Sequence, residues 1–390
     1  MARGFYLADA TVFDGARVRR RAGVLVENGR ITWVGPNARP PRAASTAREI
    51  DARGKTITPG LIDCHVHLNF DGIPNFAAEA AGMDEATAAI KGTANLRRHL
   101  AAGVTTVRDL GGLGTCQLAF AVEEGTVPGP RVIAVGRALT ITGGHGHNIG
   151  IAREIDGADD ARKAVREQLK AGARGIKVIA TGGVLTPGIT ATFTAMTPEE
   201  IGAAVDEAHK WNVGVAAHAI GGPGIAGAVR AGVDSVEHCV QLDAATAKEM
   251  AARGTFRGPT LSALLGIADG KDVPSYAKDK AVALVDDARA GHRAALRAHV
   301  RHVCSTDAGT PFNPHGNAPN ELVRMVEWGM RPLDAMIAAT ANGAELLRVP
   351  DVGRIAPGFV ADLILYDADP TRDITAVRRP RTIWKAGVKV

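Results

Sequence analysis

Two histidines stand one residue apart in a strand-like segment near the start of the chain. His65 and His67 lie within residues 61–69, where most other side chains are apolar. Because successive side chains of a β-strand point to opposite faces, these two imidazoles would point the same way, about 7 Å apart. Two imidazoles at that spacing can bind one metal ion. The pair alone is a weak indication, so the hypothesis depends on further ligand-type residues.

A lysine interrupts another apolar run. Lys177 lies within residues 175–180, and an unpaired ammonium facing the interior would cost several kcal/mol or lose its proton. A neutral lysine amine can take up CO2 and become a carbamate, an anionic ligand able to bridge two metal ions. The alternative is a lysine at a strand edge whose amine reaches solvent.

Three more ligand-type residues stand where apolar runs end. His218 lies near the end of the apolar run of residues 214–219, and His238 follows Val236 and Glu237 in the next run. Asp307 ends the run of residues 303–307, and a glycine and a proline follow it. A core histidine bonded to a backbone carbonyl remains the alternative for either imidazole. The position favours chemistry, because the active sites of β/α barrels lie at the carboxyl ends of their strands.

The elements that must position these side chains alternate between apolar strands and alanine-rich helices. That alternation predicts βα units around a parallel sheet, with helices such as 159–171, 198–211, 244–253 and 278–299. Eight strands suit a TIM (β/α)8 barrel. The expected strands are residues 61–69, 105–110, 132–139, 175–180, 214–219, 235–240, 255–260 and 303–307.

The two ends of the chain have a different texture. Residues 4–12, 23–27 and 30–34 alternate like strands, and Asn28-Gly29 between two of them is a strong hairpin signal. After a helical stretch over 332–347, residues 358–367 and 382–390 are again strand-like. Because the barrel is already full, we expect them to join the first strands in a discontinuous β-sandwich. The predicted domains are 1–57 with 352–390, and a barrel over 58–351.

Composition narrows the classes of partner. The net charge of +5 is spread along the chain, and no basic stripe interleaves with aromatic residues, which argues against nucleic-acid binding. No run of about 18 apolar residues or leader-like start is present, which argues against a membrane or secreted protein. The four cysteines form no CxxC pair. We expect a cytoplasmic protein with a small-molecule substrate; a homo-oligomer remains possible.

Together these residues resemble the amidohydrolase superfamily, and within it the binuclear zinc branch that includes Xaa-Pro dipeptidases and N-acyl amino acid hydrolases. The resemblance spans nearly the whole chain, from the Thr-Pro-Gly-Leu-Ile-Asp of residues 58–63 to the Pro-Gly-Phe-Val-Ala-Asp-Leu of residues 357–363. Between these motifs lie the ligand-type residues in the strand order of the family: His65, His67, Lys177, His218, His238 and Asp307.

The resemblance implies a TIM barrel with two divalent metal ions, expected to be Zn²⁺. It implies that His65, His67 and Asp307 hold the more buried ion and that His218 and His238 hold the other, with N6-carboxylated Lys177 bridging them. A hydroxide between the ions would attack an amide carbonyl, and Asp307 would carry its proton to the leaving nitrogen.

The same resemblance suggests residues that face the substrate. The glycine-histidine loop of residues 142–147 matches one in the dipeptidase branch, where the first histidine faces the substrate carbonyl; this implies a catalytic role for His145. His147 of the same loop is a further candidate for a substrate contact. Arg257 is a candidate on separate grounds, because it lies near a predicted strand end and a guanidinium can bind a substrate carboxylate. The chain departs from that branch at Ile220, where a tyrosine usually follows the histidine and alanine.

Several functions are compatible with this resemblance. The expected substrate is an N-acyl amino acid or a dipeptide, but the missing tyrosine leaves a carbamate, phenylurea or other arylamide as the alternative. A deaminase is disfavoured, because Lys177 is present and Gly221 stands where deaminases place a glutamate. A non-catalytic scaffold is disfavoured because every ligand position is retained.

Overall fold

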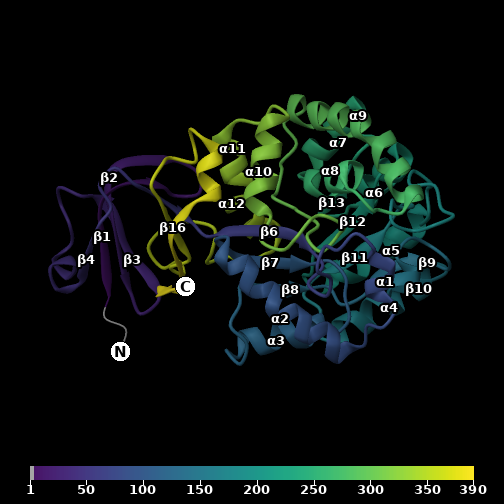
Figure 1. Ribbon diagram of the computed structural model, residues 1–390, viewed down its shortest axis with the longest axis horizontal. Helices are drawn as coiled ribbons and strands as arrows, with labels where there is room; N and C mark the ends of the chain where they lie inside the picture. Colours follow the sequence, from purple (N-terminus) through teal and green to yellow (C-terminus); the bar gives the residue numbers. More distant parts are fainter. Residues whose placement is uncertain (1–3) are drawn as a thin grey trace.

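The computed structural model describes residues 4–390, so the first three residues of the expected small domain lie outside the described part. Strands from both ends of the chain form one lobe, and strands surrounded by helices form the other (Figure 1). In the smaller lobe, one sheet has the order β17-β16-β15-β5-β1-β2-β3, with β4 beside β1. Its strands are β1 Phe5–Phe13, β2 Val18–Glu27, β3 Arg30–Pro36, β4 Arg48–Asp51, β5 Thr56–Pro59, β15 Leu363–Tyr366, β16 Pro380–Lys385 and β17 Val388–Lys389.

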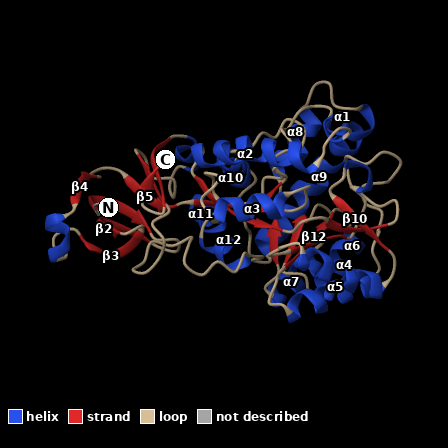
Figure 2. Cartoon of the chain, turned by 90° about the horizontal axis from the view of Figure 1, so that it is seen from below, coloured by secondary structure: helices blue, strands red, loops and turns tan. Residues whose placement is uncertain are grey.

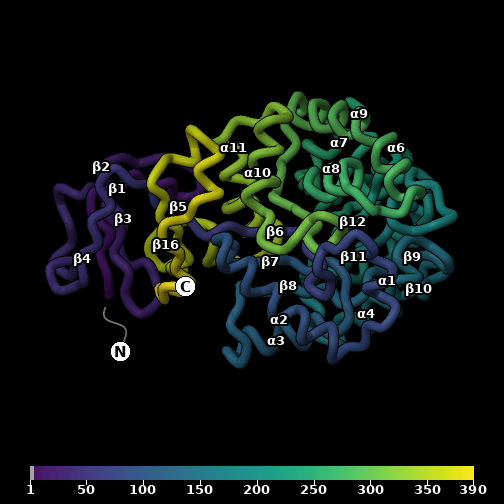
Figure 3. Tube along the Cα trace, viewed as in Figure 1, coloured from purple at the N-terminus to yellow at the C-terminus, as the bar shows by residue number. Residues whose placement is uncertain are grey.

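Local and long-range pairings explain this sheet. Asn28 and Gly29 both have positive φ, 50° and 76°, as the tight turn between β2 and β3 requires. β15 pairs antiparallel with β5 and brings the two ends of the chain together, as the tube in Figure 3 shows in purple and yellow. Phe5 stacks on Trp384 with ring centroids 5.4 Å apart. The expected terminal β module is confirmed.

The larger lobe is the predicted TIM barrel. Two parallel sheets, β6-β7-β8 and β10-β9-β11-β12-β13-β14, form most of the ring. Arg174 N donates to Ala134 O at 2.8 Å and connects the two sheets on one side. On the other side the segment around residue 303 lies between them, where Val303 N donates to Arg257 O at 3.0 Å and Cys64 N donates to Cys304 O at 2.7 Å. The strands are β6 Leu61–Val66, β7 Val104–Asp109, β8 Arg131–Ala134, β9 Ala138–Ile141, β10 Ala152–Ile155, β11 Ile176–Ile179, β12 Val215–Ala219, β13 Ser235–His238 and β14 Phe256–Gly258.

Two barrel strands differ from the expectation. The third is split into β8 and β9 around Gly136, whose φ of 71° leaves the strand region. The eighth, over residues 302–308, lies between β14 and β6 but pairs only through isolated bridges. Asp307 has a φ of 60° there, because the side-chain amide of Asn313 binds the carbonyls of Thr306 and Asp307 and turns the chain.

Helices surround the strands, as the blue ribbons outside the red strands show in Figure 2. The helical expectation over 332–347 needs correction, because Thr340 adopts a non-helical conformation and divides the stretch in two. The helices are α1 Phe76–Ala80, α2 Glu85–Ala101, α3 Thr115–Glu123, α4 Ala158–Lys170, α5 Pro198–Lys210, α6 Gly222–Ala231, α7 Ala244–Arg253, α8 Leu261–Asp269, α9 Ser275–Arg297, α10 Ala318–Glu327, α11 Pro332–Ala338 and α12 Ala341–Leu346. Over residues 4–390, none of them has the length and apolar character needed to cross a membrane.

Candidate metal centre

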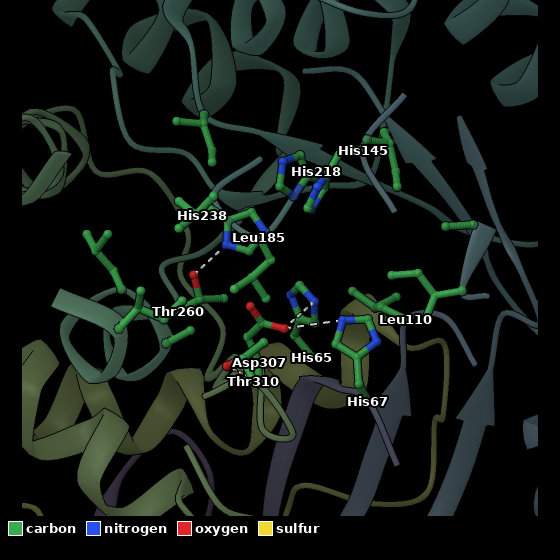
Figure 4. A pocket seen from close by; sticks show the side chains of 18 of the residues that line it. His65, His67, Leu110, His145, Leu185, His218, His238, Thr260, Asp307 and Thr310 are labelled. Atoms are coloured by element: carbon green, nitrogen blue, oxygen red, sulfur yellow. Dashed lines mark hydrogen bonds and ion pairs between the residues drawn. The ribbon is translucent and has the colours of Figure 1, made fainter. Parts of the chain in front are cut away.

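The six residues that the sequence marks as ligands meet at the carboxyl ends of the barrel strands. They line one pocket of about 850 Å³, open at its mouth (Figure 4). We call them the ligand layer: His65, His67, Lys177, His218, His238 and Asp307. The residues come from segments up to 242 positions apart in the chain, so the barrel fold is what brings them together.

Three members of the ligand layer converge on one carboxylate oxygen. The Nε2 atoms of His65 and His67 each lie 3.2 Å from Asp307 Oδ1. Backbone contacts hold the two segments together, since Asp307 N donates to His65 O and His67 N donates to Ala308 O. A ring nitrogen of His238 also lies within 4.8 Å of ligand atoms of His65 and Asp307.

The other three members lie on neighbouring strands. His218 on β12 and His238 at the end of β13 have ring centroids 4.5 Å apart. Lys177 on β11 is only 3% exposed, and burial lowers the pKa of its amine to about 8. Among the described residues, no hydrogen bond or ion pair involves its Nζ atom. The neutral amine is the form of lysine that reacts with CO2, and a lowered pKa makes this form more abundant at neutral pH.

Each imidazole of the ligand layer is held by the nitrogen that faces away from the centre. His67 Nδ1 donates to Gly111 O at 2.8 Å, and His218 Nε2 donates to Gly182 O at 2.7 Å. His65 Nδ1 lies 3.2 Å from Glu237 Oε2, and His238 Nδ1 lies 2.7 Å from the Thr260 hydroxyl. Such anchors fix the tautomer and leave the opposite nitrogen as a lone pair.

These tautomers test whether a cation fits. With Nδ1 protonated, His65 and His67 aim lone pairs at Asp307 Oδ1, a buried oxygen without a hydrogen bond to any described residue. Acceptors facing one another require a positive charge between them. Burial alone would lower the pKa of His67, but the neighbouring Asp307 carboxylate raises it. The pair of His67 and Asp307 therefore favours a positive charge between them, carried by either a proton or a metal ion. Imidazoles with a carboxylate are ligands that zinc prefers.

The ligand layer is supported by a buried ion pair to which the sequence analysis gave no role. Glu237 is fully buried on β13, where its Oε1 accepts from Arg108 Nη2 at 2.7 Å and from the Ser235 hydroxyl at 2.6 Å. Its other oxygen faces His65. The signal in the sequence was a glutamate inside an apolar strand directly before His238.

His145 lines the same pocket from the loop after β9. Its ring centroid lies 4.7 Å from that of His218, and burial lowers the pKa of His145 to about 4, so the imidazole is neutral. Its Nδ1 lies 2.7 Å from the Thr186 hydroxyl. Thr186 also accepts from Gly146 N, so its own hydroxyl hydrogen can be donated to His145 Nδ1. The nitrogen that points into the pocket then carries a hydrogen.

Two expected substrate contacts need correction. His147 is exposed and is absent from the pocket lining, because its Nδ1 bonds to Gly144 O in its own turn. Arg257 is fully buried and bonds to His292 on α9 and to backbone carbonyls, away from the lining. The reason is strand alternation: Gly258 faces the interior, where a Cβ would lie 2.2 Å from Glu237 Oε2, so Arg257 faces the helices.

Comparisons with known proteins show which proteins the chain is similar to. The sequence model of the amidohydrolase family matches residues 56–390. The ochratoxinase of Aspergillus niger is 31% identical over 400 residues, covering 94% of this chain and 82% of that protein. Among solved structures, a Xaa-Pro dipeptidase with methionine in its active site has a TM-score of 0.91 at 30% identity, covering 99% of both chains. A prolidase in complex with N-methylphosphonate-L-proline has a TM-score of 0.89 at 33% identity, again covering 99% of both chains.

Proposed function

The chain belongs to the amidohydrolase family and is a hydrolase of carbon–nitrogen bonds, and we propose that it cleaves an amide-type bond with the help of two zinc ions. The observation that carries the proposal is the set of four imidazoles whose outer nitrogens are anchored while their inner nitrogens face one centre. When bound, divalent ions lower the pKa of a water between them and polarise a carbonyl.

Within this proposal, the ligand layer divides into two sets and a bridge. His65, His67 and Asp307 would hold one ion, because their ligand atoms already converge. His218 and His238 would hold the second. Lys177 would serve both as N6-carboxylysine, formed when its neutral amine adds to CO2 and releases a proton.

Asp307 is the proposed general base and acid. Burial alone would raise the pKa of its carboxyl group, but the neighbouring His65, His67 and Lys177 lower it below the ordinary value. Asp307 is therefore ionised at neutral pH and can accept the proton of the attacking water. It then delivers that proton to the leaving nitrogen.

His145 supplies the hydrogen bond that the family's tyrosine would make elsewhere. Its neutral ring directs an N–H into the pocket because Thr186 occupies the other nitrogen. Ile220, which also lines the pocket, cannot donate a hydrogen bond. A carbonyl between the ligand layer and His145 would be polarised from both sides.

The test is controlled removal and return of zinc. Protein stripped by a chelator should regain about two ions per chain and its amide hydrolysis, and regain them more fully in buffer with bicarbonate than in buffer without CO2. Uptake of one ion per chain at saturation, or no effect of bicarbonate, would count against the carboxylated bridge.

The four buried, unpaired thiols support the proposal of a reducing, cytoplasmic setting.

A further inference from the structure

The wall of the pocket narrows the substrate class. We infer that the bond cleaved belongs to an uncharged amide, carbamate or urea with apolar substituents, and not to a substrate with a carboxylate beside the scissile nitrogen. This inference rests on the proposed function and specifies its substrate. It departs from the first expectation of an N-acyl amino acid or dipeptide, both of which carry that carboxylate.

The argument begins with the strands that carry the ligands. A residue two positions further along a strand points to the same face, about 7 Å above its predecessor. Ile179 stands at that position after Lys177 on β11. Ile220 directly follows β12, and Val240 follows the left-handed residues His238 and Cys239 at the end of β13. All three are large and apolar, and all three line the pocket. The layer directly above the ligands is therefore an aliphatic collar.

The rest of the wall has the same character. The loop after β11 contributes Val184 and Leu185, and α8 contributes Leu264 and Ile267. Leu110 and Leu185, both labelled in Figure 4, also line the pocket. Among the described residues of the lining, the charged side chains other than histidines are Lys177 and Asp307, both within the ligand layer. Nothing above that layer balances an anion.

Cations near the pocket are engaged elsewhere. Lys280 on α9 donates to the carbonyls of Thr186 and Gly183 and is not among the residues that line the pocket. Arg108 pairs with Glu237 below the ligand layer, and Arg257 faces α9. A carboxylate on the carbon bonded to the scissile nitrogen cannot reach the mouth, because only two bonds separate it from that nitrogen. It would be buried against the collar without a partner.

Three benzamides test the inference on the zinc-loaded enzyme. N-benzoylphenylalanine carries the carboxylate, N-benzoylphenylalaninamide replaces it with a neutral group of equal size, and N-(2-phenylethyl)benzamide lacks it. We expect kcat/KM to be at least about tenfold higher for each neutral compound, because the acid buries an unpaired charge. Cleavage of the acid as fast as the neutral compounds would overturn the inference and leave the hydrolase intact.

If the enzyme cleaved none of the three compounds, that result would count against the proposed function. Binding of the three compounds would then test the substrate inference separately. The shift in melting temperature at equal ligand concentration should then be larger for the neutral compounds; an equal or larger shift with the acid would overturn it. A matched pair of variants on α8 sharpens the test. Leu264→Lys adds a cation to the partly buried wall and should lower the kcat/KM ratio of neutral compound to acid at least about tenfold. Leu264→Gln should leave this ratio unchanged. Unchanged selectivity in a folded Leu264→Lys protein would also contradict the inference.

Discussion

Strands hold one side of the pocket and loops hold much of the other. Lys177 and His218 project from paired strands, and both side chains are buried. His145 lies on a loop instead, and its orientation depends on Thr186 of a second loop, 41 positions away. The strand side therefore has its geometry built into the barrel, whereas the loop side depends on a few side-chain contacts. We expect substitutions on the strand side to cost more.

Removing the proposed bridge should have the largest effect. Lys177→Ala should lower kcat by at least about a thousandfold, since losing a metal site forfeits several kcal/mol of transition-state stabilisation. Acetate or propionate should restore part of the activity by filling the space of the carbamate. Lys177→Met fills that space with a side chain that cannot be carboxylated, and it should not respond. Rescue of both variants, or a fully active Lys177→Ala enzyme, would refute the bridge.

Asp307→Asn should have the second-largest effect on turnover. Asparagine keeps the size of the side chain and one coordinating oxygen but cannot accept a proton. We expect kcat to fall by about a hundredfold or more, as for other general acid–base groups, while zinc content and KM change much less. Elemental analysis and steady-state kinetics measure the two effects separately. Near wild-type turnover would mean that another group moves the proton.

The fold and the ligand layer could be predicted because they follow regular periods. The two-residue spacing of His65 and His67 requires only strand alternation, and eight apolar segments separated by helical stretches favour a barrel. The same regularity misled the interpretation of Arg257. Its strand was placed correctly, but which face was interior depended on Gly258, whose lack of a side chain makes room for Glu237.

The third prediction concerns the support beneath the ligand layer. Glu237→Gln keeps the shape of the side chain but weakens its contacts to His65 and Arg108. We expect zinc affinity to fall about 10- to 100-fold, the usual effect of losing a group that orients a ligand, with activity returning in excess zinc. Glu207→Gln makes the same change in an ion pair with Arg166 on the helical surface and should leave zinc affinity unchanged. Equal effects of the two substitutions on zinc affinity would mean that Glu237 has no specific role in supporting the ligand layer.

The loop side could not be predicted in the same way. Thr186 lies among glycine, threonine and proline residues that have no period, and its contact with His145 depends on how two loops fold over the barrel. The close approach also needs Gly183, where a Cβ would lie 2.3 Å from the His145 ring. Sequence patterns identify strands that share a face, but they do not identify loops that meet.

The smallest expected effect tests this contact. Thr186→Val removes the hydroxyl that fixes the His145 tautomer, so kcat should fall about five- to tenfold, the value of one hydrogen bond, with zinc content unchanged. Thr186→Ser should restore the rate, and Thr190→Val, at an exposed position of the same loop, should be silent. The decisive measurement is a double-mutant cycle: in a His145→Ala background, Thr186→Val should have no further effect on kcat. If it lowered kcat by the same factor there, Thr186 would act on the loop as a whole, and the loop side of the pocket would be as firmly built as the strand side.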